Sequence, residues 1–207
     1  MAHLDEAAQA EFRHHGYQFP CAGIGAALAA EALAALEAYE QDLGGTLTTL
    51  GPSARYKLHV KLPWMSALVR EDAILDAIED LIGPDILVYT STIFAKEPHT
   101  DSVTLWHQDA TYFGLRPHEH VTAWVALSEA SAEAGCMTFL SEAGNPRLYY
   151  HRPNMDPKSI NGGGQTIVEP FDDQTGVRAT LASGEFSLHH TLCIHSSPPN
   201  HTAMRRI

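Results

Sequence analysis

The sequence has few basic residues and few cysteines, and each shortage excludes a class of protein. Lys and Arg total 13 against 25 Asp and Glu, which gives a formal net charge of -12. This balance argues against a nucleic-acid partner, because affinity for a phosphate backbone depends largely on clustered Lys and Arg. Cys21, Cys136 and Cys193 are odd in number and widely spaced. They therefore predict neither a disulfide framework nor a four-cysteine zinc site.

Long apolar runs are also missing. Apolar stretches are interrupted every few residues, which excludes a membrane-spanning helix and a membrane partner. The first residues, Met1–Glu6, lack the basic and apolar regions of a secretory signal, so we expect a cytoplasmic protein. A chain of 207 residues with 44% hydrophobic and 18% charged residues is the size and composition of one globular domain. We expect residues 1–207 to form a single domain that is a monomer or a homodimer.

The first 85 residues are predicted to be mainly helical. Residues 24–43 are rich in Ala, carry large apolar residues at spacings of three and four, and stop at Gly44. Residues 66–82 repeat the pattern and end before Gly83. Both segments are typical of helices that cover a core.

From residue 86 onward the sequence predicts strands. β-branched and aromatic residues become frequent, and turn residues separate the segments 86–94, 103–109, 121–128, 136–140, 165–169 and 185–195. No segment of helical length lies between them, which favours a sandwich, jelly roll or barrel over a parallel sheet. Residues 141–164 are predicted to form a long connection of the kind that often builds a site.

Histidine is abundant, with 13 residues of 207, and its spacing suggests a metal site. Two histidines and one carboxylate on one side of a metal leave three positions open, which suits ferrous iron that binds a chelating co-substrate and dioxygen together. The pattern H-x-D supplies two such ligands on a strand, because side chains at i and i+2 point to the same side. Three pairs fit this pattern: His3/Asp5, His99/Asp101 and His107/Asp109.

The third pair is the strongest candidate. His3 lies at a terminus that is expected to fray, and His99 lies in a predicted loop after Pro98. His107 and Asp109 instead close a predicted strand, where an inward-facing His and Asp need a polar partner. A metal ion is one such partner.

The third ligand must come from another segment, and His195 is the best candidate because it ends a strand just before a Pro-rich turn. His189, Cys193 and His195 would share one face of that strand, so a Cys/His zinc site remains an alternative. Arg205 or Arg206 could clamp the carboxylate of a keto acid with two parallel hydrogen bonds. On sequence alone, a basic surface pair explains these two arginines equally well.

Four segments together resemble the phytanoyl-CoA dioxygenase family of 2-oxoglutarate-dependent non-haem iron oxygenases. They are Trp106–Phe113, Val121–Leu127, Gly135–Met137 and His195–Ile207. The resemblance implies a mainly β fold with a double-stranded β-helix (jelly-roll) core over 86–207, and N-terminal helices over 1–85 packed on its outside.

The resemblance also assigns site residues. It implies that Fe(II) is held by His107, Asp109 and His195. It places the 2-oxoglutarate carboxylate on Arg206, with Arg205 as the alternative. The positions that match the rest of the co-substrate site are Ser197, Trp124, Gln108 and Thr92.

The activity implied is hydroxylation of an unactivated C–H bond of a small molecule, with dioxygen consumed and succinate and carbon dioxide released. Because halogenating members lack the carboxylate ligand, the presence of Asp109 favours hydroxylation over chlorination. Tyr112, Arg116 and His151 are candidates to face the substrate, although each also fits an ordinary loop. Two other functions stay open: a non-catalytic jelly-roll binding module and a metal-dependent hydrolase.

Overall fold

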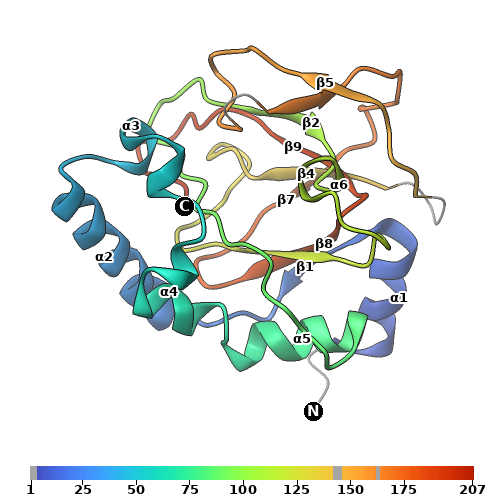
Figure 1. The fold of residues 1–207 in the computed structure, drawn as a ribbon, viewed down its shortest axis with the longest axis horizontal. Coiled ribbons are helices and arrows are strands. Elements are labelled where there is room, and N and C mark those ends of the chain that lie inside the picture. The colour runs from blue at the N-terminus through green and yellow to red at the C-terminus, as the bar shows by residue number, and fades with distance from the viewer. Residues whose placement is uncertain (1–3, 142–145, 162–163) are drawn as a thin grey trace.

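Two antiparallel sheets form the centre of the protein (Figure 1). The computed structural model describes residues 4–141, 146–161 and 164–207. One sheet has the order β1 (Tyr17–Cys21), β8 (Phe186–His190), β3 (Val121–Val125). The other has the order β2 (Thr104–His107), β9 (Ile194–Ser197), β4 (Met137–Leu140), β7 (Val177–Ala179). A hairpin of β5 (His151–Pro153) and β6 (Gln165–Ile167) lies beside β2. The predicted jelly-roll core is confirmed.

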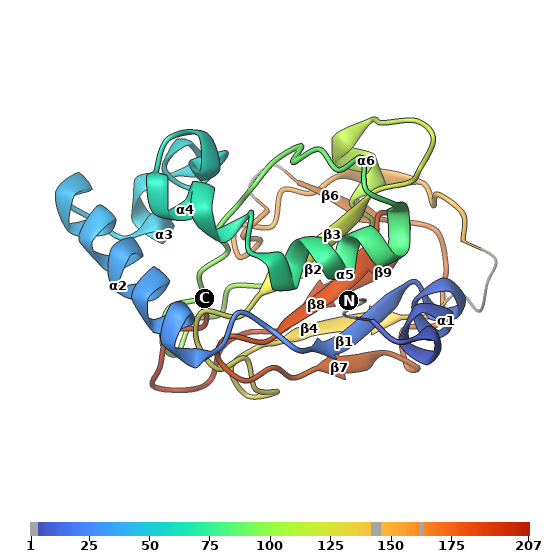
Figure 2. The same ribbon diagram turned by 90° about the horizontal axis from the view of Figure 1, so that it is seen from below.

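The three-stranded sheet has one apolar and one polar face. Phe186 and Leu188 on β8 pack with residues of β3 against α1 (Glu6–His15) and α5 (Asp72–Ile82), and Figure 2 shows both helices beside this sheet. Side chains alternate between the two faces of a strand. The residues between, including Ser187 and His189, therefore face the interior between the two sheets.

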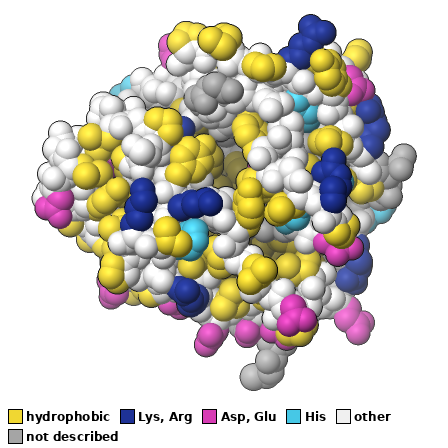
Figure 3. Space-filling model, viewed as in Figure 1, with side chains coloured by type: hydrophobic (Ala, Val, Ile, Leu, Met, Phe, Trp, Pro, Cys, Tyr) yellow, Lys and Arg dark blue, Asp and Glu magenta, His cyan; other side chains and the backbone are white. Residues whose placement is uncertain are grey.

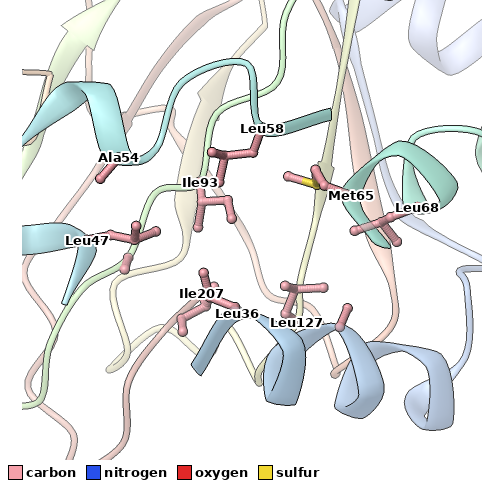
Figure 4. Close-up of a cluster of buried hydrophobic side chains, with 11 residues drawn as sticks. Leu36, Leu47, Ala54, Leu58, Met65, Leu68, Ile93, Leu127 and Ile207 are labelled. Carbon is pink, nitrogen blue, oxygen red and sulfur yellow. The ribbon is translucent and has the colours of Figure 1, made fainter. Parts of the chain in front are cut away.

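The remaining helices form a layer at one side of the sheets. They are α2 (Ala26–Leu43), α3 (Leu47–Leu50), the 3-10 turns η1 (Pro52–Ala54) and η2 (Leu58–Val60), and α4 (Pro63–Leu68). Their apolar side chains meet Ile93, Leu127 and Ile207 in one buried cluster (Figure 4). Since Leu127 follows β3 and Ile207 lies next to Arg206, this cluster ties the helical layer to the sheets. None of the described helices has both the length and the apolar character needed to cross a membrane.

Several predicted elements match the structure with shorter bounds, and three do not. The helix at 24–43 and the strands at 103–109, 121–128, 136–140 and 165–169 correspond to α2, β2, β3, β4 and β6. The prediction of one helix over 66–82 is wrong, because the chain turns at residues 69–71 and divides it into α4 and α5. The prediction of one strand over 185–195 is also wrong, since a turn at 191–193 separates β8 from β9 and moves the chain to the other sheet.

The predicted strand at 86–94 is wrong because, within the described residues, this extended segment makes only an isolated bridge, from Thr92 to Tyr56. Its backbone bonds there to the connection between η1 and η2, through Lys57 N to Ser91 O (2.7 Å) and Ile93 N to Arg55 O (3.2 Å). The segment is not buried along one face as a core strand would be, because Leu87 is 93% exposed and only its end, at Ile93, joins the buried cluster. Strands β1, β5 and β7 have no counterpart among the predicted elements, and β1 shows that the segment 1–85, predicted to be mainly helical, contributes a strand to the core.

Candidate metal centre

His107 and His195 lie directly opposite each other on two neighbouring strands. His107 ends β2, His195 lies in β9, and the two residues are paired in the antiparallel ladder. Their ring centroids are 4.1 Å apart, and both residues are 5% exposed. Directly opposed residues in an antiparallel pair project from the same face of the sheet. The ladder therefore brings together two histidines that are distant in the sequence.

Asp109 completes the group from a different element. The strand ends at His107, and Asp109 is the residue that precedes the short helix α6 (Ala110–Phe113). Its Oδ1 lies 3.7 Å from His107 Nε2 and 3.8 Å from His195 Nε2. The carboxylate thus converges with the imidazoles through a turn, and not through the continuous strand that the H-x-D spacing predicted.

Each histidine presents an unprotonated nitrogen to this point. His107 Nδ1 bonds to the carbonyl of Leu105 (2.8 Å), and His195 Nδ1 bonds to the carbonyl of Cys193 (3.0 Å). A carbonyl oxygen can only accept, so Nδ1 carries the proton of each neutral ring and Nε2 keeps its lone pair. Metal-bound histidines are usually oriented by this kind of bond from the second nitrogen.

The carboxylate of Asp109 is oriented in the same way. Its Oδ2 accepts hydrogen bonds from Thr122 Oγ1 (2.7 Å) and His189 Nε2 (3.2 Å), which leaves Oδ1 directed at the two ligand nitrogens. Burial alone would raise the pKa of Asp109, but the imidazoles of His107 and His189 hold it well below its usual range. Burial, together with the neighbouring His107 and His189, keeps the pKa of His195 well below its ordinary value. The lowered pKa values of Asp109 and His195 therefore favour an ionised carboxylate beside a neutral His195 imidazole at neutral pH.

This donor set fits a ferrous ion. Among the described residues, His107, Asp109 and His195 are the group of His, Cys, Asp and Glu side chains whose ligand atoms all lie within 4.8 Å of one another. Two imidazole nitrogens and one carboxylate oxygen match the facial triad of non-haem Fe(II) oxygenases. Cys193 does not join them: it lies in the turn before β9, and its Sγ contacts the carbonyl of Leu140 at 3.8 Å. The arrangement on which the zinc alternative depended, with Cys193 on the strand face of His189 and His195, is thus not formed.

The two candidate arginines differ sharply in their surroundings. Arg205 forms ion pairs with Glu40 (2.8 Å) and Glu97 (3.0 Å). Arg206 is 2% exposed, its guanidinium lies 5.2 Å from the Trp124 ring centroid, and its Nη1 donates to the carbonyl of Phe94 (3.2 Å). Its Nε has no hydrogen-bond partner among the described residues. Arg206 is thus the arginine with donor capacity left for an anion.

Of the other predicted co-substrate residues, Ser197 lies beside the ligand group, whereas Gln108 and Thr92 bond to other parts of the protein. Ser197 is buried, and it shares the face of β9 with His195 because it lies two residues further along the strand. Gln108 is fully buried, but its amide bonds to the carbonyls of Arg147 and Leu192 and accepts from Tyr149 N. Thr92 pairs with Tyr56 at the edge of the helical layer. Ser197 lies beside the ligand group, whereas Gln108 braces the surrounding loops.

The three candidates for the substrate side are also separated by the structure. Tyr112 packs edge-on against His107, with ring centroids 5.7 Å apart. Arg116 is exposed and donates to the carbonyl of Leu115. His151 accepts from Gln108 N (3.1 Å) and donates to the carbonyl of Tyr149 (2.8 Å). Only Tyr112 touches the metal group.

The alternative pair His99/Asp101 does not form a comparable site. His99 is exposed, with a φ of 50° that marks a turn, and Asp101 pairs with Lys158 at 3.2 Å. His3 lies outside the described residues.

Sequence reasoning missed two buried polar residues next to the site. The role of His189 as a partner of Asp109 was not foreseen, and Lys96, which is 0% exposed, was not considered. The alternation of polar and apolar residues in Phe186–His190 was the one available signal for His189. No comparable signal marks Lys96, because lysine is normally exposed.

In this jelly roll, two histidines and a carboxylate meet at one point. This is the architecture of a non-haem iron oxygenase. The comparison with family models agrees: the model for phytanoyl-CoA dioxygenase (PhyH) matches residues 12–207. The chain belongs to the phytanoyl-CoA dioxygenase family.

Similar proteins include a Stutzerimonas stutzeri protein named "Probable alpha-ketoglutarate-dependent hypophosphite dioxygenase". It is 28% identical over 149 residues, which cover 72% of this chain and 52% of that protein. Phytanoyl-CoA dioxygenase domain-containing protein 1 of Danio rerio is 32% identical over 124 residues, or 58% of this chain and 42% of that protein. The chain spans about half the length of these curated relatives.

Solved structures agree with the fold. The non-heme monooxygenase ThoJ, in its apo form, is 30% identical with a TM-score of 0.81, covering 96% of this chain and 74% of that one. EvdO2 from Micromonospora carbonacea var. aurantiaca, complexed with 2-oxoglutarate, is 19% identical with a TM-score of 0.70, covering 98% and 87%. At this lower identity, EvdO2 supports the fold alone.

Proposed function

We propose that this chain is an Fe(II)- and 2-oxoglutarate-dependent dioxygenase that hydroxylates an unactivated C–H bond of a small-molecule substrate. The observation that carries the proposal is the convergence of Asp109 Oδ1 with the Nε2 atoms of His107 and His195. The other polar atom of each of these three side chains is already bonded within the protein. The family and the relatives named for alpha-ketoglutarate dependence support the choice of metal and co-substrate.

Each residue has a defined task in this proposal. His107, Asp109 and His195 would hold the metal and leave one side open. Arg206 and Ser197 would bind the far carboxylate of 2-oxoglutarate, with the Trp124 ring fixing the plane of the guanidinium. When bound, the ferrous ion and the keto acid supply the oxidising chemistry, with succinate and carbon dioxide as by-products.

Aromatic side chains shield the centre from water. Phe139 is 0% exposed, and its ring centroid lies 5.3 Å from His189 and 6.1 Å from His195. Tyr112 covers the edge of His107. The face of the molecule in Figure 3 is hollowed near its centre, and mostly hydrophobic side chains border the hollow, with Lys and Arg side chains to one side. A hollow of this composition fits a small molecule that is largely apolar.

The test starts from an anaerobic titration of the protein with Fe(II) and then 2-oxoglutarate. A screen of candidate substrates follows, read out as succinate released on admission of oxygen. Asp109→Ala should abolish Fe(II) binding and succinate release. Asp101→Ala is the matched control, because it removes the carboxylate of a second H-x-D pair that lies exposed and away from the centre.

The two alternatives give different results in the same assay. A non-catalytic binding module would release no succinate, and its ligand binding would survive Asp109→Ala. A metal-dependent hydrolase would turn over under nitrogen. Either result would refute the proposed function.

A further inference from the structure

Lys96 is a charged residue with no contact to solvent, and the proposed chemistry leaves it without a role. It is 0% exposed. It lies in the segment after Ile93 and pairs with Arg206 in an isolated antiparallel bridge, with Lys96 N to Arg206 O at 2.9 Å and the reverse bond at 3.0 Å. Directly opposed residues in such a pair place their side chains on the same side. The backbone of Lys96 therefore fixes the position of Arg206.

The amine of Lys96 is directed at the strand that carries a metal ligand. It donates to Ser197 Oγ at 2.7 Å and to the carbonyl of Pro198. Because Ser197 Oγ accepts this bond, its own hydroxyl hydrogen remains available for a further acceptor. Ser197 lies on the same face of β9 as His195. The available hydrogen therefore lies on the side of the sheet where the keto acid would bind.

The two buried basic groups have no carboxylate beside them in the described part of the chain. Neither Lys96 nor Arg206 forms an ion pair there, and Glu97, the residue after Lys96, is paired with Arg205, as is Glu40. Burial, and then the charge of Arg206, lower the pKa of Lys96 to about 6, and burial lowers the pKa of Arg206 to about 10. Buried charges are normally paired, so protonating both groups is costly unless an anion lies beside them. An anionic ligand would relieve the cost.

We propose that Lys96 is a positioning residue of the 2-oxoglutarate site, which acts on the far carboxylate through Ser197 and Arg206. The proposal rests on the proposed function and adds a residue to it. Lys96 holds the serine hydroxyl as a donor, fixes the arginine backbone, and adds positive charge where the carboxylate binds when it takes up a proton beside the bound anion.

The experiment measures binding of two keto acids to the Fe(II)-loaded protein by calorimetry under argon. The first ligand is 2-oxoglutarate, and the second is 2-oxobutanoate, which keeps the chelating end but lacks the far carboxylate. Lys96→Met should weaken 2-oxoglutarate binding roughly tenfold to a hundredfold, as expected for loss of support to a charged hydrogen bond. Binding of 2-oxobutanoate should not change. Lys61→Met is the matched control, because the exposed Lys61 amine also donates to a backbone carbonyl, that of Ser53.

The two ligands separate positioning from general structural damage. Equal weakening of both ligands, or no weakening of either, would overturn the role of Lys96. If Lys96→Met does not fold, Lys96→Gln serves as the second variant; it keeps an N–H donor without the charge and should show a smaller loss that is still confined to 2-oxoglutarate. If the wild-type protein itself binds no 2-oxoglutarate, the proposed function fails and this inference fails with it. Tight binding by wild type and variant alike refutes the inference alone.

Discussion

Replacing Lys96 with methionine is expected to stabilise the protein when metal and co-substrate are absent. The side chain is 0% exposed. Burial, and then the neighbouring Arg206, lower its pKa from 10.5 to about 6. In the unfolded chain the amine keeps its proton up to its ordinary pKa, so between these two values the unfolded state binds more protons than the folded state. The free energy of unfolding therefore rises with pH across this window.

The magnitude follows from the same two pKa values. At pH 7, the amine of the folded state has lost a proton that the unfolded chain holds up to a pKa of 10.5. At about 1.4 kcal/mol per pH unit, this difference destabilises the folded state by about 5 kcal/mol. Methionine avoids this cost but loses the hydrogen bonds to Ser197 and Pro198, at about 1 kcal/mol each. The net expectation is a gain of about 3 kcal/mol at pH 7.

The assay is urea unfolding of the metal-free wild type and Lys96→Met at pH 7 and pH 9.5. At pH 9.5 only about 1 kcal/mol of the titration cost remains, so the lost hydrogen bonds roughly cancel it. The stability difference should therefore shrink from about 3 kcal/mol to about zero. A variant that is less stable than wild type at pH 7, or a gain of equal size at both pH values, would refute the reasoning.

Three further predictions test the surroundings of the site. His189→Leu removes a hydrogen bond to Asp109 and should weaken Fe(II) binding about tenfold; unchanged affinity in a chelator competition would contradict this role. Phe139→Ala removes a fully buried ring and should cost about 3–5 kcal/mol in urea unfolding, so a loss below about 1 kcal/mol would show that the ring is not packed as described. Burial raises the pKa of Glu40, but hydrogen bonds, chiefly from Arg205, lower it overall. The stabilisation that this lowered pKa gives is present above the ordinary pKa of a glutamate and is lost as the pH falls through the pKa of the folded state. Glu40→Gln should therefore cost about 2 kcal/mol at pH 7 and progressively less in acid. A cost that is independent of pH would contradict the ion pair.

The convergence of His107, Asp109 and His195 and the general fold could be predicted because their signals are local. The segment around His107 and the segment around His195 each carry a motif that is recognisable without knowing how the strands pair. The helix α2 was also predictable, since its apolar residues repeat over Ala26–Leu43 and a left-handed Gly44 follows it. The predictions that failed concern features that depend on which segments pair with each other. Residues 86–94 have the composition of a strand, but a strand needs a neighbour, and the described residues supply only isolated bridges there.

Lys96 shows the same limit at the site. Its burial results from pairing with Arg206, which lies at the far end of the sequence. Lysine in an extended segment is usually solvated, so no local pattern distinguishes this one. The two arginines fit the site equally well by sequence spacing, and only the resemblance to the family favoured Arg206 over Arg205 for 2-oxoglutarate. Their surroundings depend on residues distant in sequence, since Glu40 and Glu97 form ion pairs with Arg205.

The polarity of the two sheet faces explains why the helices are needed. Three atoms on the interior side, His189 Nδ1, Ser187 Oγ and Arg206 Nε, are buried without a hydrogen-bond partner among the described residues. Each such atom lowers the stability that burial on this side would otherwise give. The interior still buries an apolar cluster around Phe139. Further apolar burial lies on the opposite face, where Phe186 and Leu188 pack beneath α1 and α5. The outer face and its helices thus add stability where no polar group interrupts the packing, while the interior keeps its polar groups available for metal and keto acid.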